Sequence, residues 1–133
     1  MNNYLIKVEY DGTNYVGWQK QINGKSIQEE IEKCLKHLFK EEIDLYVAGR
    51  TDSGVHAIEQ VAHFDTKYYI DPKKIYLALN SLLQKSKNMI SILDSEEVRP
   101  SFHSRFSAKK RTYLYKILNR QTFSPLDYNR FYQ

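Results

Sequence analysis

Residues 43–66, IDLYVAGRTDSGVHAIEQVAHFDT, contain the pattern that decides the fold. Every second residue from Ile43 to Val47 is apolar, and such alternation predicts a strand with one buried face. A second strand is predicted over Gln60–Thr66. The segment AGRTDSGVHA at 48–57 lies between them and contains one carboxylate, Asp52. The sequence therefore predicts two strands joined by a loop that presents an acid.

Glycines stand on both sides of this acid, at Gly49 and Gly54. Glycine lets a backbone turn sharply and lets a ligand come close to it. Arg50 precedes Asp52 by two residues, so a cation and an acid share the loop. By pattern alone an ordinary turn is the simpler interpretation, because Asp and Gly are common turn residues.

The rest of the chain predicts helices and strands in alternation. Tyr4–Tyr10 alternates as a strand, and Ser26 with Glu29 forms a capping-box pattern that begins a helix. The apolar stripe of that helix is Ile27, Ile31, Cys34, Leu35 and Leu38, while Glu29, Glu30, Lys33 and Lys36 are expected mostly outside it. Cys34 is therefore interpreted as a small core residue rather than a nucleophile.

A second helix is predicted to follow Asp71, with Pro72 in its first turn. Strands are predicted over Met89–Leu93 and Thr112–Asn119. The series β-α-β-β-α-β predicts an α+β fold, a ferredoxin-like sandwich whose sheet is mainly antiparallel and carries its helices on one face.

Composition limits the classes of function. The 133 residues suit one compact domain or part of a larger one, and the net charge of +4 is compatible with a polyanion such as RNA. A single Cys allows no internal disulfide and, with four scattered His, gives no zinc-ligand spacing. The sequence has no apolar run that could cross a membrane and no signal-peptide core, so we expect a cytoplasmic protein.

Several ordered motifs resemble the tRNA pseudouridine synthase A family. AGRTDSGVHA is similar to the signature of that family. Further matches are VEYDGTNYVGWQ at 8–19, SIQE at 26–29, QVAHF at 60–64, FHSRFSA at 102–108 and RTYLY at 111–115. The segment Gln84–Asn88 departs from the shorter, proline-containing turn of the family.

The resemblance covers nearly the whole chain and implies the N-terminal half of a pseudouridine synthase fold. On this basis 1–108 is the ferredoxin-like unit, 109–119 a strand leading to a second half, and 120–133 a weakly anchored tail.

The resemblance also implies a reaction and its residues. It assigns isomerisation of uridine to pseudouridine in the anticodon stem-loop of tRNA, at positions 38 to 40, with Asp52 as the catalytic carboxylate. It assigns Tyr113 to stacking on the uracil, and Arg50 suits a phosphate clamp or the space left by a flipped base. No cofactor or metal is expected, and the family implies a homodimer. Basic residues among aromatic ones suggest RNA contacts at Arg105, Lys109, Lys110 and Arg111.

Other interpretations stay open at this point. Tyr113 could be an ordinary residue of the sheet, and Arg50 could only pair with Asp52. Each Lys could belong to a solvated edge of the molecule. An RNA-binding module with the same fold but no chemistry is the main alternative, although it would not need a constrained carboxylate. A glycosidase would want two cooperating carboxylates. We expect this chain alone to fold without turning over tRNA, because the second half would complete the cleft.

Overall fold

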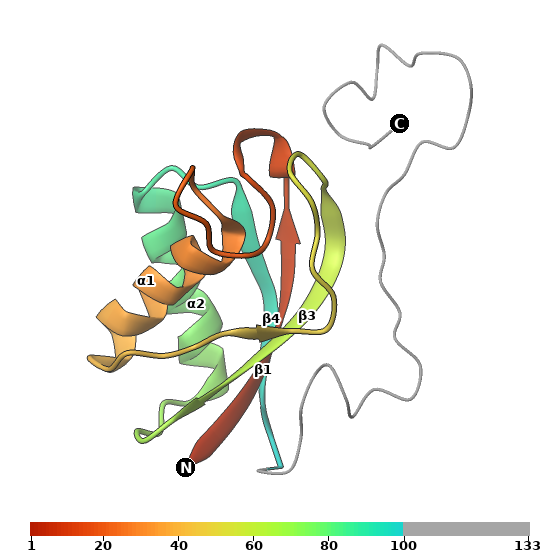
Figure 1. Ribbon diagram of the computed structural model, residues 1–133. Helices are drawn as coiled ribbons and strands as arrows, with labels where there is room; N and C mark the ends of the chain where they lie inside the picture. Colours follow the sequence, from red (N-terminus) through yellow and green to blue (C-terminus); the bar gives the residue numbers. More distant parts are fainter. Residues whose placement is uncertain (100–133) are drawn as a thin grey trace.

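A four-stranded antiparallel sheet and two helices make up the part of the chain that the computed structural model describes, residues 1–99. Figure 1 shows both helices on the same face of the sheet. The strands follow the order β2-β3-β1-β4, which with the β-α-β-β-α-β succession confirms the predicted ferredoxin-like α+β fold. The elements are β1 (Asn2–Tyr10), a short 3-10 helix η1 (Gly12–Asn14), α1 (Ile27–Phe39), β2 (Tyr46–Val47), β3 (Ala57–Thr66), α2 (Pro72–Lys85) and β4 (Ile90–Val98).

The central strand β1 owes its place to its alternating sequence. Tyr4, Ile6, Val8 and Tyr10 are all buried, whereas Glu9 on the opposite face is exposed. β1 pairs with β3 on one side and β4 on the other, both antiparallel. The buried face contributes to the core with apolar residues of both helices, including Ile31, Leu35, Leu79 and Leu83. Burial of this face fixes the register of the sheet, because a slip by one residue would expose it.

Both helices begin where the sequence predicts. The Ser26 side chain accepts a hydrogen bond from the Glu29 N–H at 3.1 Å, and Asp71 does the same for Lys73 at 2.9 Å. Pro72 occupies the first turn of α2, where its missing N–H costs nothing. α1 ends at Phe39 and is capped by Lys40, which adopts a left-handed conformation.

One expectation for α1 was wrong. Glu30 was predicted to lie mostly outside the apolar stripe, but the residue is only 7% exposed. Its carboxylate is retained there because Lys33 Nζ lies 3.3 Å from Oε2 and the Asn88 side chain donates to Oε1 at 3.0 Å. A buried charge is tolerated when it is paired and hydrogen-bonded in this way.

The strand predicted over Ile43–Val47 is shorter than expected. Ile43 and Leu45 are buried as the alternation predicts, but only Tyr46–Val47 pairs with β3. The Leu45 N–H instead donates to Glu32 Oε2 at 2.9 Å, so a side chain of α1 takes the hydrogen bond that a sheet neighbour would supply. In contrast, β4 extends from Ile90 to Val98, beyond the predicted Met89–Leu93.

Residues 100–133 lie outside the described part of the chain. They include the predicted strand within 109–119 and the tail 120–133, as well as the end of the expected unit 1–108. Those boundaries stay predictions.

Candidate active site

Asp52 lies in the loop between β2 and β3, beside the loop that joins β1 to α1 (Figure 1). We call 48–56 the Asp52 loop and 11–25 the N-terminal loop. Backbone hydrogen bonds connect the two: the Trp18 N–H donates to the Thr51 carbonyl at 3.0 Å and the Gly54 N–H to the Tyr15 carbonyl at 3.3 Å. The candidate site is therefore assembled from two segments about 40 residues apart in sequence.

Thr51 anchors the Asp52 loop to the sheet. The residue is 7% exposed, and its hydroxyl shares a hydrogen bond of 2.7 Å with the Tyr10 hydroxyl at the end of β1. On the other side, the Gln60 amide of β3 donates to the Gly49 carbonyl at 2.7 Å. Hydrogen bonds to the sheet therefore hold the stem of the loop that carries Asp52.

Two glycines of the N-terminal loop allow the loops to touch. A Cβ on Gly12 would overlap the carbonyl oxygen of Val55, and a Cβ on Gly17 would lie 2.7 Å from the Thr51 carbonyl oxygen and 3.1 Å from the Asp52 carbonyl carbon. Gly17 also has a φ of 113°, a value that side chains strongly disfavour. Glycine is thus required at both positions by the closeness of the Asp52 loop.

His56 closes the Asp52 loop from its far end. The imidazole is buried, and its Nδ1 accepts a hydrogen bond from the Gly12 N–H at 2.8 Å. Asp11 Oδ1 lies 3.1 Å from the same nitrogen. His56 therefore joins the two loops, because its Nδ1 lies within hydrogen-bond distance of both Gly12 and Asp11 of the N-terminal loop.

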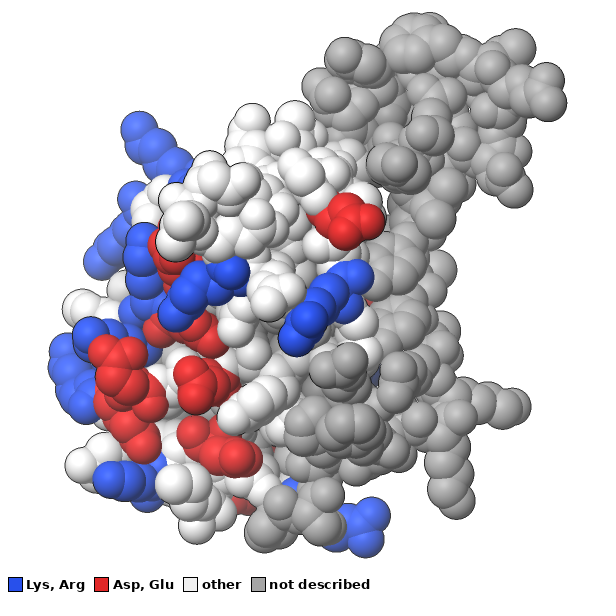
Figure 2. All heavy atoms as spheres, in the orientation of Figure 1, with Lys and Arg blue, Asp and Glu red and all other residues white. Residues whose placement is uncertain are grey.

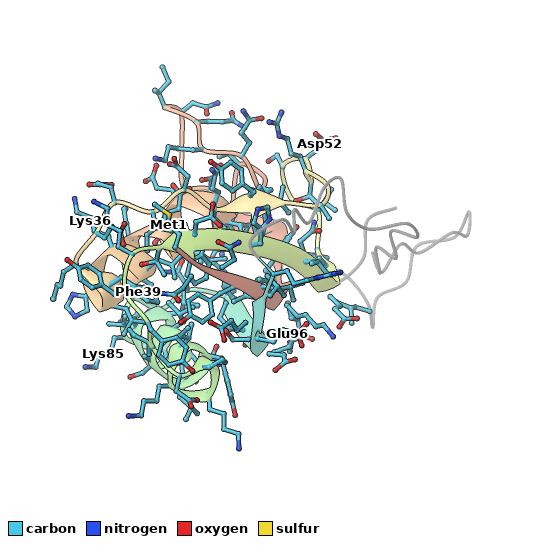
Figure 3. The ribbon with its side chains drawn as sticks, turned by 90° about the horizontal axis from the view of Figure 1, so that it is seen from below. Met1, Lys36, Phe39, Asp52, Lys85 and Glu96 are labelled. Carbon is cyan, nitrogen blue, oxygen red and sulfur yellow. The ribbon has the colours of Figure 1, made fainter. Side chains whose placement is uncertain are left out.

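The Asp52 side chain itself is exposed and lies at the edge of the molecule, as Figure 3 shows. Ser53 and Arg50 are exposed beside it. Within residues 1–99, no ion pair joins Arg50 to Asp52, so the interpretation of Arg50 as a simple partner of this acid has no support in the geometry. Gly54 has the positive φ expected of a turn glycine, 77°, whereas Gly49 does not. The carboxylate is thus presented outward from a loop with a fixed backbone.

The other predicted site residues lie outside the described part of the chain: Tyr113, Arg105, Lys109, Lys110 and Arg111. Over the face shown in Figure 2, basic and acidic side chains are intermingled rather than sorted into a basic patch. Ion pairs within residues 1–99 include Lys33 with Glu29 at 3.4 Å and Lys20 with Glu32 at 3.3 Å.

Sequence reasoning missed how much Tyr15, Asn88 and His56 contribute to the candidate site. Tyr15 and His56 lie inside the matched motifs but carry no spacing signal of their own. Asn88 lies far along the chain, and only the folded chain brings its side chain within 2.8 Å of the Tyr15 hydroxyl.

Cys34 is confirmed as a core residue. The residue is 7% exposed, and burial raises the pKa of its thiol from 9.0 to about 11, so the thiol stays protonated near neutral pH. No group of three or more His, Cys, Asp or Glu within the described residues is arranged to hold a metal ion. Neither described helix has the length and apolarity needed to cross a membrane.

A family model described as tRNA pseudouridine synthase matches residues 6–107 of this chain. The match begins within β1, extends through β4 and includes both loops of the candidate site. The chain belongs to the tRNA pseudouridine synthase family. The resemblance seen in the sequence motifs is thereby confirmed.

Several curated bacterial proteins are similar to this member of the family. A tRNA pseudouridine synthase A of Clostridium acetobutylicum is 49% identical over 133 residues, which is 100% of this chain and 53% of that protein. A tRNA pseudouridine synthase A 2 of Clostridium tetani is 51% identical over 132 residues, covering 98% of this chain and 52% of the relative. The corresponding protein of Ehrlichia canis is 48% identical over 128 residues, with 96% and 51% covered. The chain thus spans about half the length of the curated relatives it matches.

Proposed function

We propose that this chain forms half of an enzyme that isomerises uridine to pseudouridine in the anticodon stem-loop of tRNA, with Asp52 as the catalytic carboxylate. The observation that carries the proposal is the presentation of Asp52: its side chain is exposed, while the loop backbone around it is fixed by the sheet and the N-terminal loop. Membership of the tRNA pseudouridine synthase family and the names of the relatives support this assignment.

The reaction needs little more than a well-placed carboxylate. The C1′–N1 bond of the uridine breaks, the uracil turns, and a new bond forms between C1′ and C5. The hydrogen on C5 leaves and N1 gains one, so nothing is oxidised and no group is imported. An aspartate at the ribose–base junction can act as a nucleophile, or as a base and electrostatic partner of the electron-poor sugar. A fixed backbone suits either role, because misplacement by 1 Å can cost about a hundredfold in rate.

Arg50 and Tyr113 are proposed to handle the substrate. A uridine in a stem must leave its stack before its glycosidic bond can be reached. Arg50 is exposed two residues before Asp52 and has no ion pair with it, so its guanidinium is available to clamp a phosphate or fill the vacated space. Tyr113 is proposed to stack on the uracil while the detached ring turns. Arg105, Lys109, Lys110 and Arg111 are proposed to contact the RNA backbone.

We further propose that the complete enzyme is a cytoplasmic homodimer that positions tRNA at uridines 38 to 40, as the family resemblance implies. Residues 1–133 would supply the acid, and a segment corresponding to the unmatched half of the curated relatives would supply the opposite wall of the cleft.

The test uses a chimera in which residues 1–133 replace the matched half of the Clostridium acetobutylicum relative. The chimera is incubated with unmodified tRNA, and pseudouridine is detected chemically at single-nucleotide resolution. Asp52→Asn is expected to lower turnover by several powers of ten while tRNA affinity changes little, since the amide keeps the shape and loses the charge. Asp44→Asn removes another exposed carboxylate and is expected to be fully active.

Turnover above about a tenth of the wild-type value in Asp52→Asn would exclude the catalytic role of this acid. Binding of tRNA without any isomerisation by the unmutated chimera would instead favour an RNA-binding module. Modification of uridines outside the anticodon stem-loop would refute the substrate assignment alone.

A further inference from the structure

Tyr15 contacts the Asp52 loop through its backbone. Its carbonyl oxygen accepts the Gly54 N–H at 3.3 Å and the Ser53 hydroxyl at 3.3 Å. Both donors belong to the two residues that directly follow Asp52. The position of one carbonyl oxygen therefore limits where the loop can place its acid.

The Tyr15 side chain fixes that carbonyl from the other direction. The residue is only 4% exposed, and its hydroxyl accepts the Met89 N–H at 2.9 Å and donates to Asn88 Oδ1 at 2.8 Å. Burial raises the pKa of the Tyr15 phenol, so the hydroxyl keeps its proton and its role as a donor. With a donor and an acceptor both engaged, the ring is held to the turn that joins α2 to β4.

Asn88 extends these contacts to the helix α1. Its amide nitrogen donates to Glu30 Oε1 at 3.0 Å and to the Ser86 hydroxyl at 2.8 Å, which uses both of its hydrogens. Glu30 is itself held by Lys33. A continuous set of hydrogen bonds thus leads from a buried carboxylate of α1, through Asn88 and Tyr15, to the residues that follow Asp52.

We propose that Tyr15 is a positioning residue for Asp52 and that Asn88 and Glu30 act through it; the proposal rests on the proposed function of Asp52. Tyr15 is not a catalytic residue, because its side chain is buried and its hydroxyl is occupied by Asn88 and Met89. The Glu30–Asn88–Tyr15 contacts hold the Tyr15 carbonyl in place, and the carbonyl holds the backbone at Ser53 and Gly54. This gives the buried Glu30 a function that the apolar pattern of α1 does not require.

The chain provides a matched control for Tyr15→Phe. Tyr4 is also buried, and its hydroxyl also makes two hydrogen bonds to other groups, the Ile70 carbonyl at 2.8 Å and the Ile70 N–H at 3.0 Å. Both substitutions remove a buried phenolic hydroxyl from the same core, but only Tyr15 contacts the Asp52 loop. A purely structural role would make the two variants alike.

The first measurement is amide hydrogen exchange of the 133-residue chain by NMR. Tyr15→Phe is expected to speed exchange at Gly54 about tenfold relative to wild type, the factor that loss of one buried hydrogen bond corresponds to. Tyr4→Phe is expected to lower the melting temperature about as much as Tyr15→Phe does, but to leave the exchange rate at Gly54 unchanged. Equal Gly54 rates in the two variants would overturn the positioning role.

The second measurement is turnover by the chimera with the Clostridium acetobutylicum relative. Tyr15→Phe is expected to lower kcat about tenfold with KM unchanged, and Tyr4→Phe to keep the wild-type kcat. Asn88→Ala is expected to resemble Tyr15→Phe in both measurements. The double variant is expected to be no worse than either single one, because the two residues act along one path.

The outcomes separate this proposal from the function on which it rests. Gly54 could exchange faster in Tyr15→Phe while Asp52→Asn keeps full activity. That result would refute the catalytic role of Asp52, and with it any effect on catalysis of positioning Asp52 through Tyr15. An inactive Asp52→Asn together with wild-type kcat in Tyr15→Phe would overturn the role of Tyr15 alone. Additive losses in the double variant would exclude the path through Asn88.

Discussion

Substitution of Gly17 by alanine is expected to disrupt the candidate site where the N-terminal loop contacts the backbone of the Asp52 loop. The added Cβ would lie 2.7 Å from the Thr51 carbonyl oxygen, a backbone atom that cannot rotate away, and 3.1 Å from the Asp52 carbonyl carbon. The φ of 113° adds strain of about 1–3 kcal/mol for any residue with a side chain. Separation of the loops would also weaken the 3.0 Å hydrogen bond from the Trp18 N–H to Thr51, worth about 1 kcal/mol.

These contributions predict that Gly17→Ala lowers the free energy of unfolding by about 2–4 kcal/mol. The assay is urea unfolding of the 133-residue chain followed by fluorescence of its single tryptophan, Trp18, which is 1% exposed and reports directly on this loop. Turnover by the chimera should fall about a hundredfold, since the clash displaces the peptide of Asp52 itself.

Gly54→Ala is the matched control. Gly54 also has a positive φ, 77°, but a Cβ there would have no atom within 4 Å. Its expected cost is therefore the backbone strain alone, about 1–2 kcal/mol. If Gly54→Ala destabilised the chain as much as Gly17→Ala, close contact between the loops would not be the reason for glycine at Gly17.

Three other measurements address the core and the completeness of the site. Cys34 should resist a thiol reagent such as Ellman's reagent at pH 8 and react fully in urea, because burial raises its pKa to about 11; labelling of the folded chain would contradict this. The same raised pKa predicts that the protonated thiol contributes fully to the free energy of unfolding below pH 9.0, and that this contribution is lost as the pH rises from 9.0 to about 11. Cys34→Ala should therefore flatten the pH dependence of the melting temperature in that window. Finally, the isolated 133-residue chain should melt cooperatively by circular dichroism and yet form no pseudouridine in tRNA; multiple turnover would mean that these residues contain the whole active site.

The local sequence determined where most elements begin and which faces they bury. Alternation at Tyr4–Tyr10 predicted β1. The caps Ser26 and Asp71 predicted where both helices begin, in agreement with the structure. These features depend on neighbours within a few residues, so they can be read from the chain directly. The motif AGRTDSGVHA likewise located the loop that holds Asp52.

The tertiary structure alone decided how that loop is held. The contact of Gly17 with the Asp52 loop, and the path from Glu30 through Asn88 to Tyr15, join residues separated by up to 73 positions. Local periodicity favoured an exposed Glu30, and alternation favoured a longer strand before Val47. In each case a distant partner changed the result, because Asn88 satisfies the buried carboxylate and Glu32 takes the backbone hydrogen bond of Leu45. Hydrogen bonds between distant segments leave no periodic trace in a sequence, so the fixed backbone around Asp52 became visible only in the folded chain.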